Sequence, residues 1–191
     1  THYNDWSEIP TGYSQQEWSS LFTGAYSVYP ADSSITCGDN CADVYGNLYN
    51  WHAVGDDRGI CPEGWHVPED EEYTALTDYL GGADVAGGKM KEAGTAHWNS
   101  PNTGATNESG FTALPAGYRN NGPNLTYQFI ETFGFYWSAT NNSNDQSWII
   151  ELSHDDSEIT RHSSINSHGF SIRCLETVEG CTDESACNYD Q

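Results

Sequence analysis

The chain is poor in positive charge. It has 6 Lys and Arg residues against 28 Asp and Glu residues, which gives a formal net charge of -22. Proteins bind nucleic acid mainly by neutralising phosphates with Lys and Arg side chains. The composition therefore excludes nucleic acid as a partner, and it disfavours an anionic membrane surface for the same reason. Neutral ligands such as sugars, and divalent cations, are compatible with it.

Long apolar runs are absent too. No stretch of eighteen apolar residues occurs, so the sequence predicts no membrane insertion. It holds a single methionine, whereas aromatic residues make up 13% and glycines number 19. Such a chain builds its core from large rigid rings and uses many residues in turns. A length of 191 residues suits one domain with a short appendage.

Cysteine is the exception to this scarcity. The six comprise two close pairs and two residues far apart in sequence: Cys37, Cys41, Cys181, Cys187, Cys61 and Cys174. A zinc site is the alternative for the first pair, but no second CxxC-like pair or His partner lies at finger spacing. We expect three disulfides, whose connectivity the sequence leaves open. Disulfides predict an oxidising, extracellular location.

The early part of the chain predicts helices. Ser14 and Glu17 have capping-box form, and apolar residues at helical spacing follow until Gly24. Residues 47–54 are rich in aromatic side chains, and their apolar and polar residues alternate, which predicts a strand. Pro68 and the acidic residues after it begin a second helix, and a further short turn is expected at 88–93. The buried stripe of the second helix is expected to be Tyr73, Leu76 and Leu80.

The later part predicts short strands joined by loops rich in Asn, Ser and Gly. The expected strands are 111–119, 135–140, 147–153, 158–163 and 169–174. Early helices followed by antiparallel strands form an α+β pattern. The predicted organisation is an extended segment at 1–13, a main domain at 14–176 and a Cys-rich tail at 177–191.

Several long motifs carry a family resemblance. They are YGNLYNWHAV, GICPEGWHVPEDEEYTALTDYLGG, AGGKMKEAGTAHWNSPNTGATNESGFTALPAGYRNNG, FGFYWSAT and HGFSIRCLE. Together they resemble the Fibrobacter succinogenes major paralogous domain, over about residues 3–176. That family is in turn similar to the C-type-lectin-like and formylglycine-generating-enzyme superfamily. WHVPEDEEYTAL resembles that superfamily's RLPTEAEWE helix entry, and GFSIRC resembles its closing GFR strand.

The resemblance implies a C-type-lectin-like α+β fold. Two main helices would pack against a small twisted antiparallel sheet with long loops, and a Cys61–Cys174 disulfide would tie the helix entry to the last strand. The tail GCTDESACNYDQ resembles the start of a GCTDxxACNYD Cys-rich repeat of secreted bacterial proteins. A chain that begins at Thr1 without a leader is expected to be a processed, extracellular or cell-surface bacterial protein.

Catalytic motifs are lacking. The formylglycine-generating relatives use a reactive cysteine pair near their last strands, where this chain has Cys174 alone. The chain has seven histidines, but none of them lies in an HExxH motif. The sequence also contains no G-x-S-x-G motif and no P-loop. His66 is interpreted as a structural residue, and the adjacent Asp155 and Asp156 would face opposite sides of a strand. We therefore expect no enzyme activity and no cofactor.

A sugar or calcium site is the next possibility. The EPN, QPD and WND triplets of C-type lectins are absent, so their sugar site is not carried over. Polar loops could still offer amides and carboxylates to a glycan or to calcium. The candidate ligand-binding residues are Asn120, Asn121, Asn141 and Asp145. Trp98 and Trp137 could stack on a sugar ring, with burial in the core as the alternative.

The two ends of the chain suggest assembly. An extended segment dotted with apolar residues and a partial repeat could contact neighbouring copies, by strand addition or head to tail. The expected assembly contacts are Tyr3, Trp6, Ile9, Tyr13, Asn188 and Tyr189. The alternative is that both ends pack on their own domain. The leading hypothesis is a non-catalytic, self-assembling subunit of a surface fibre or layer, and the alternative is a carbohydrate-binding adhesin or accessory module of polysaccharide degradation.

Overall fold

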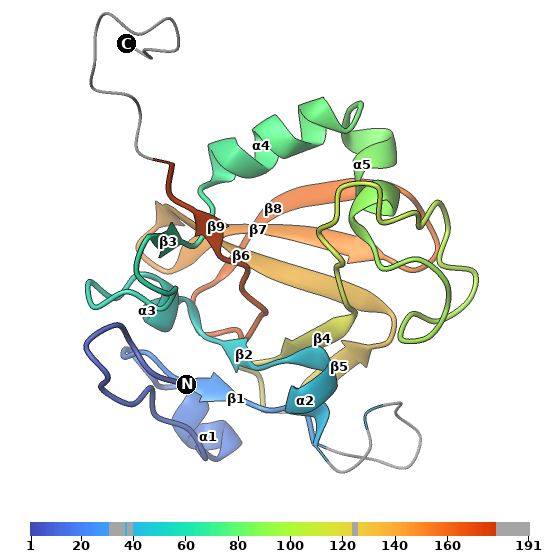
Figure 1. The fold of residues 1–191 in the computed structure, drawn as a ribbon. Helices are drawn as coiled ribbons and strands as arrows, with labels where there is room; N and C mark the ends of the chain where they lie inside the picture. The colour runs from blue at the N-terminus through green and yellow to red at the C-terminus, as the bar shows by residue number, and fades with distance from the viewer. Residues whose placement is uncertain (31–36, 38–39, 124–125, 179–191) are drawn as a thin grey trace, which may run out of the picture.

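A computed structural model describes residues 1–30, 37, 40–123 and 126–178 (Figure 1). Its helices are α1 (Gln15–Trp18), α2 (Cys41–Tyr45), α3 (Trp51–Val54), α4 (Asp70–Tyr79) and α5 (Ala83–Met90). Its strands are β1 (Tyr26–Ser27), β2 (Leu48–Tyr49), β3 (Trp65–His66), β4 (Ala116–Arg119), β5 (Tyr127–Ile130), β6 (Phe133–Ser143), β7 (Gln146–Ser153), β8 (Ile159–Ile165) and β9 (Leu175–Glu176). None of the helices in these residues is long and apolar enough to cross a membrane.

A curved five-stranded sheet forms the body of the molecule. Its strands lie in the order β5-β4-β6-β7-β8, and two-stranded ribbons pair β1 with β2 and β3 with β9. All pairs are antiparallel except β4 and β6, which run parallel at Gly117 and Gly134. Gly117 has a φ of +60° and lies against the backbone of β5, where a side chain has no space. Glycine is therefore what lets β4 approach both neighbours at this point.

The core consists of two main clusters on the sheet. One packs α4 and α5 against the sheet and contains Tyr73, Met90, Trp98, Ile150 and Leu152. The other includes Cys61 of the long-range disulfide and contains Val67, Phe135, Trp137, Ile149 and Phe170. Helices α4 and α5 lie along one side, with α1, α2, β1 and β2 on the opposite side of the molecule (Figure 1). Large rings fill both clusters, as the composition predicts.

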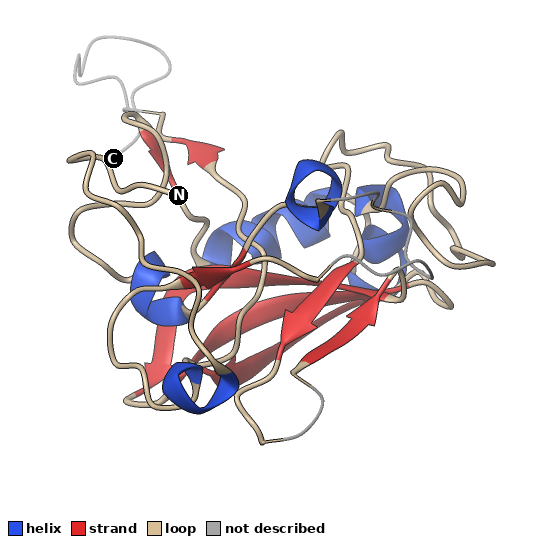
Figure 2. Ribbon diagram, turned by 90° about the horizontal axis from the view of Figure 1, so that it is seen from below, coloured by secondary structure: helices blue, strands red, loops and turns tan. Residues whose placement is uncertain are grey.

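The expected fold class is wrong. The long strands β6, β7 and β8 dominate the structure, and more residues lie in strands than in helices. Figure 2 shows the sheet running through the molecule with short helical turns around it. The structure is thus mostly β, and not two main helices against a small sheet. The physical reason is that the predicted first helix ends early, while the Asn- and Ser-rich hairpin residues continue the strands.

Three local predictions also need correction. The first helix has its Ser14–Glu17 capping box but ends at Trp18, and Phe22 lies exposed beyond it. Residues 47–54 form the two-residue strand β2 and then helix α3. Asn50 causes this change because its side-chain oxygen accepts the N–H of Ala53 as an N-cap. The short turn expected at 88–93 is instead helix α5, which begins earlier, at Ala83.

Two disulfides are present in the described residues. Cys61 bonds Cys174, with a Cα–Cα distance of 5.7 Å and a sequence separation of 113. Cys37 bonds Cys41, with a sequence separation of 4. The expected third pair lies outside the described residues. The long-range bond fixes β9 and the segment that precedes β3 to one another.

A buried lysine holds the long loop after α5. Lys91 is fully buried, and its Nζ donates to the carbonyls of Thr103, Ser153 and Asp156 at 3.0, 2.6 and 2.7 Å. Burial lowers the pKa of Lys91 to about 8. Thr103 lies in the loop after α5, whereas Ser153 and Asp156 lie at and just beyond the end of β7, so this one side chain connects two segments that are far apart in sequence.

Candidate functional site

The segment 59–76 lines three surface hollows in succession. The first, the hairpin hollow, has a volume of about 620 Å³ and includes Ile60, Pro62 and Glu63. The second, the strand hollow, has a volume of about 390 Å³ and shares Ile60 with the first. The third, the aromatic cleft, has a volume of about 420 Å³ and begins at Pro68. These volumes lie within the range of sites for small ligands.

The far wall of the hairpin hollow is a tight N-terminal hairpin. The N–H of Tyr3 donates to the carbonyl of Ser7, the N–H of Trp6 donates to the carbonyl of Tyr3, and His2 pairs with Glu8. Trp6 has a φ of +67° and its side chain is 85% exposed. A positive φ is unfavourable for a large residue and persists only where its surroundings hold it. The fold therefore holds an indole ring in solvent at the edge of this hollow.

The surroundings of Trp6 form a rigid support. Tyr3 is buried, and the guanidinium of Arg58 lies over its ring at 3.8 Å. Arg58 also donates to the hydroxyl of Ser7 at 2.9 Å and to the carboxylate of Asp56 at 2.7 Å. The Asp56 hydrogen bond raises the pKa of Arg58, so the guanidinium keeps its charge. The hairpin is thus attached to the domain on both of its strands.

The strand hollow has its own exposed indole. Trp65 lies on β3, opposite Glu176 of β9, and its ring is 45% exposed. The backbone N–H of Trp65 donates to the carbonyl of Pro62 at 2.9 Å, and Cys61 in the same turn carries the long-range disulfide. We call Trp6, Trp65 and the two hollows that share Ile60 the tryptophan surface. Its polar lining residues are His2, Asn4, Glu63, His66, Glu69 and Thr177.

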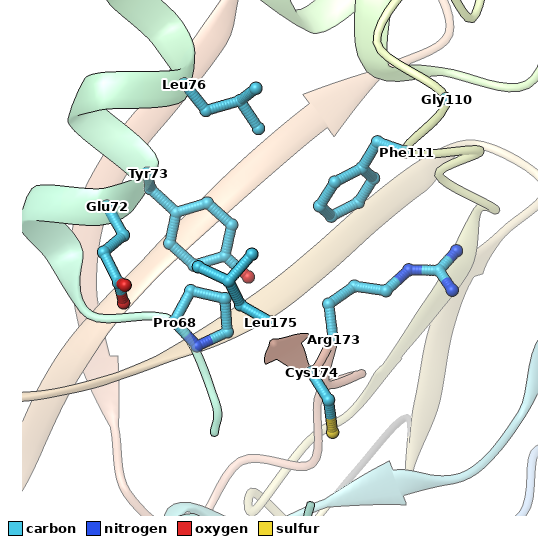
Figure 3. Close-up of a pocket in the computed structure, with 9 residues that line it drawn as sticks. All are labelled: Pro68, Glu72, Tyr73, Leu76, Gly110, Phe111, Arg173, Cys174 and Leu175. Atoms are coloured by element: carbon cyan, nitrogen blue, oxygen red, sulfur yellow. The ribbon is translucent and has the colours of Figure 1, made fainter. Parts of the chain in front are cut away.

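The aromatic cleft lies between α4, the loop at 110–111 and the start of β9 (Figure 3). The rings of Tyr73 and Phe111 face the cleft from opposite walls, and Glu72 and Arg173 lie on its two sides. Burial, together with the nearby Tyr136, raises the pKa of Tyr73, so its hydroxyl stays neutral. The cleft therefore combines apolar walls with one acidic and one basic side chain.

A hydrogen-bonded pair, His66 and Glu72, lies between the aromatic cleft and the tryptophan surface. His66 Nε2 lies 3.0 Å from both carboxylate oxygens of Glu72, and Nδ1 lies 2.8 Å from the hydroxyl of Thr177. His66 lines the strand hollow, whereas Glu72 lines the cleft. Both ring nitrogens are thus engaged, which agrees with a structural role for His66.

The predicted ligand-binding asparagines lie elsewhere. Asn121 and Asn141 bond to Ser167 and Ser147, at 2.9 and 3.3 Å, and the carbonyl of Asp145 accepts the N–H of Asn166. Residues 166–167 therefore connect the two predicted loops. The side-chain oxygen of Asn120 accepts a hydrogen bond from the N–H of Gly122. None of these four candidates lines any of the three hollows described above.

The predicted assembly contacts divide into two groups. Tyr3 and Ile9 are 3% and 2% exposed, because they pack with Tyr49 and Ala53 in the core of their own domain. Trp6 is exposed and Tyr13 is half-buried. Asn188 and Tyr189 lie outside the described residues. Among the predicted contacts that the structure describes, Trp6 is therefore the one with the largest exposed fraction.

Two further candidates fall in the core. Trp98 and Trp137 are buried, and their indole N–H groups donate to the carbonyls of Ala113 and Tyr49. They offer no stacking face to a ligand. No group of three or more His, Cys, Asp or Glu side chains placed to hold a metal occurs within the described ranges.

Sequence reasoning did not point to several residues that line these hollows. Trp65, Glu72, Phe111 and Arg173 were not singled out as site residues. Glu72 and Arg173 are far apart in the chain, and only the fold brings them to one cleft. The available signal was weaker: Trp65 directly follows the Pro- and Gly-containing turn after Cys61, where a large apolar residue has little core to enter.

A family model for the Fibrobacter succinogenes major domain matches residues 2–176. The chain therefore belongs to this family, as its motifs predicted. No curated protein and no solved structure matched the chain.

Proposed function

We propose that this member of the Fibrobacter succinogenes major domain family is a non-catalytic extracellular module that binds carbohydrate through its tryptophan surface. The observation that carries the proposal is the exposure of two indole rings, Trp6 and Trp65, on rigid supports beside adjoining hollows. An exposed aromatic ring offers an apolar face to the C–H side of a sugar. Carboxylate, amide and imidazole groups around it can bond the hydroxyls.

Charge supports a neutral ligand. With a formal net charge of -22, the chain repels polyanions, and it also repels identical copies of itself. A neutral glycan meets no such barrier. Disulfides are typical of oxidising compartments, which supports an extracellular location. The wider superfamily relationship and the Cys-rich repeat at the C-terminus stay predictions from sequence motifs.

The experiment is a binding titration of neutral polysaccharides and their oligosaccharides by calorimetry, after a glycan-array screen, with and without calcium. We expect saturable binding that Trp6→Ala and Trp65→Ala each weaken about tenfold or more, since truncating a contacting indole removes a large share of an interface's binding energy. Tyr79→Ala is the matched control, because Tyr79 is 86% exposed but lines none of the hollows described above. Absence of any saturable glycan, or equal affinity in all variants, would contradict the proposal.

Self-assembly is the second candidate, and exposure of Trp6 is the observation in its favour. Burial of Tyr3 and Ile9 removes two of its expected contacts. Light scattering of the wild-type chain and Trp6→Ala distinguishes the two functions. Polymers that the substitution dissolves would support assembly, whereas a monomer that binds glycan supports the module.

A further inference from the structure

Each hollow of the tryptophan surface combines an exposed indole with a glutamate. Trp6 and Glu63 line the hairpin hollow. Trp65 and Glu69 line the strand hollow. Both glutamates are exposed, and neither makes a salt bridge within the part of the chain that the structure describes. Two carboxylates are therefore available on the surface that we propose for carbohydrate.

Positive charge is scarce around these carboxylates. No lysine or arginine is among the described residues that line either hollow. Arg58 supports the hairpin, but its guanidinium is paired with Asp56 at 2.7 Å, and Asp5 also acts on it. His66 lines the strand hollow, and its Nε2 lies 3.0 Å from the carboxylate of Glu72. The electrostatic potential over both hollows is therefore negative, in a chain with a formal net charge of -22.

Indole rings and carboxylates favour the same kind of ligand group. A cation is attracted to the face of an aromatic ring, and tryptophan attracts it most strongly. A carboxylate accepts short, charge-assisted hydrogen bonds from an ammonium group. Charges act over about 10 Å in about 0.1 M salt, so a glutamate that lines a hollow attracts a cation there even without direct contact. A neutral sugar meets no barrier at this surface, whereas a sugar with an ammonium group is attracted to it.

We infer that the tryptophan surface prefers amino sugars with a free, protonated amine over neutral sugars of the same shape. The inference rests on the proposed carbohydrate function and narrows it to a class of ligand. The indole rings contact the C–H face of the sugar, and the carboxylates of Glu63 and Glu69 attract its ammonium group. An N-acetylated amino sugar carries no positive charge and loses this attraction, and a sugar acid is repelled.

The probe is the β-1,4-linked disaccharide of glucosamine, titrated into the full chain at about pH 7, where an amino group is largely protonated. The matched sugar is the β-1,4-linked disaccharide of glucose, in which a hydroxyl replaces each amine. We expect the amino disaccharide to bind about tenfold more tightly, measured by NMR or calorimetry, since exposed ion pairs and cation–π contacts act together. Equal binding of the two sugars would overturn the inference but leave the proposed function intact. If neither sugar saturates the chain, the inference is overturned, and the array of neutral glycans decides the proposed function separately.

Variants that remove one charge locate the effect. We expect Glu63→Gln and Glu69→Gln each to weaken binding of the amino disaccharide about twofold to fivefold, which is the range of an exposed ion pair, and to weaken binding of the glucose disaccharide less. Glu158→Gln is the matched control, because Glu158 is exposed and lines neither hollow, and its substitution changes the net charge equally. An equal loss in Glu158→Gln would indicate attraction to the chain as a whole and would refute the inference. Equal weakening of both sugars by the hollow variants would also refute it.

Discussion

His168 should make the fold sensitive to mild acid. Its ring packs against Tyr118 and Phe170, at centroid distances of 5.5 and 5.7 Å, and its nitrogens lie 2.9 Å from Ser164 Oγ and 3.2 Å from Asn121 Oδ1. Burial lowers the pKa of His168 from 6.5 to about 4. The unfolded chain therefore binds more protons than the folded chain between these values. Stability from this residue is present above pH 6.5 and falls as the pH drops toward 4.

The size of the effect follows from the two pKa values. Proton linkage at one site takes about 2 kcal/mol from the free energy of unfolding between pH 7 and pH 5, and about 3 kcal/mol by pH 4. His168→Gln keeps a polar side chain but removes the titration. Urea unfolding of the wild-type chain and of His168→Gln at several pH values gives the difference between their free energies of unfolding. The contributions of the carboxylates, which both proteins share, cancel in this difference.

The control is His162→Gln, because the side chain of His162 is 44% exposed. We expect its stability to follow that of the wild-type chain across the same range. The reasoning is refuted if wild type and His168→Gln lose stability in parallel between pH 7 and pH 4. It is also refuted if His162→Gln removes as much acid sensitivity as His168→Gln.

Two stability predictions complete the set. Replacing Cys61 and Cys174 by Ala opens a separation of 113 residues and should cost about 5 kcal/mol, whereas the same change at Cys37 and Cys41 should cost about 2 kcal/mol; unfolding titrations without reductant check the order. Gly117→Ala should cost about 3 kcal/mol or more, because the new Cβ would lie 2.1 Å from the carbonyl oxygen of Gln128. Gly12→Ala, at a φ of +83° in open space, should cost about 1 kcal/mol in the same thermal-unfolding assay.

Local chemistry explains which elements could be predicted. The Ser14–Glu17 capping box needs only neighbouring residues, and the structure contains it. Tyr73 and Leu80 lie buried along α4 and its C-cap, as their spacing predicted. The prediction of a strand at 47–54 is wrong because eight residues are too few to distinguish a strand from a short helix by periodicity. There, one capping bond from Asn50 decides the outcome.

The hollows could not be predicted in the same way. Each combines residues from distant parts of the chain, such as Trp6 with Ile60 or Glu72 with Arg173. Nothing in local spacing records these neighbours. The polar loops drew attention by composition, yet their asparagines mainly bond the chain itself. Asparagine side chains in loops readily bond neighbouring backbone groups, so composition alone does not identify a ligand site.

The segment 59–76 contributes to the lining of the hairpin hollow, the strand hollow and the aromatic cleft. It is attached by the Cys61–Cys174 disulfide to the residue before β9, and it continues into α4. Substitutions in this one segment would therefore change the lining of all three hollows while the five-stranded sheet stays the same. The exposed positions of the segment suit a randomised library, provided that Cys61, Val67 and Tyr73, which pack in the core, are kept constant.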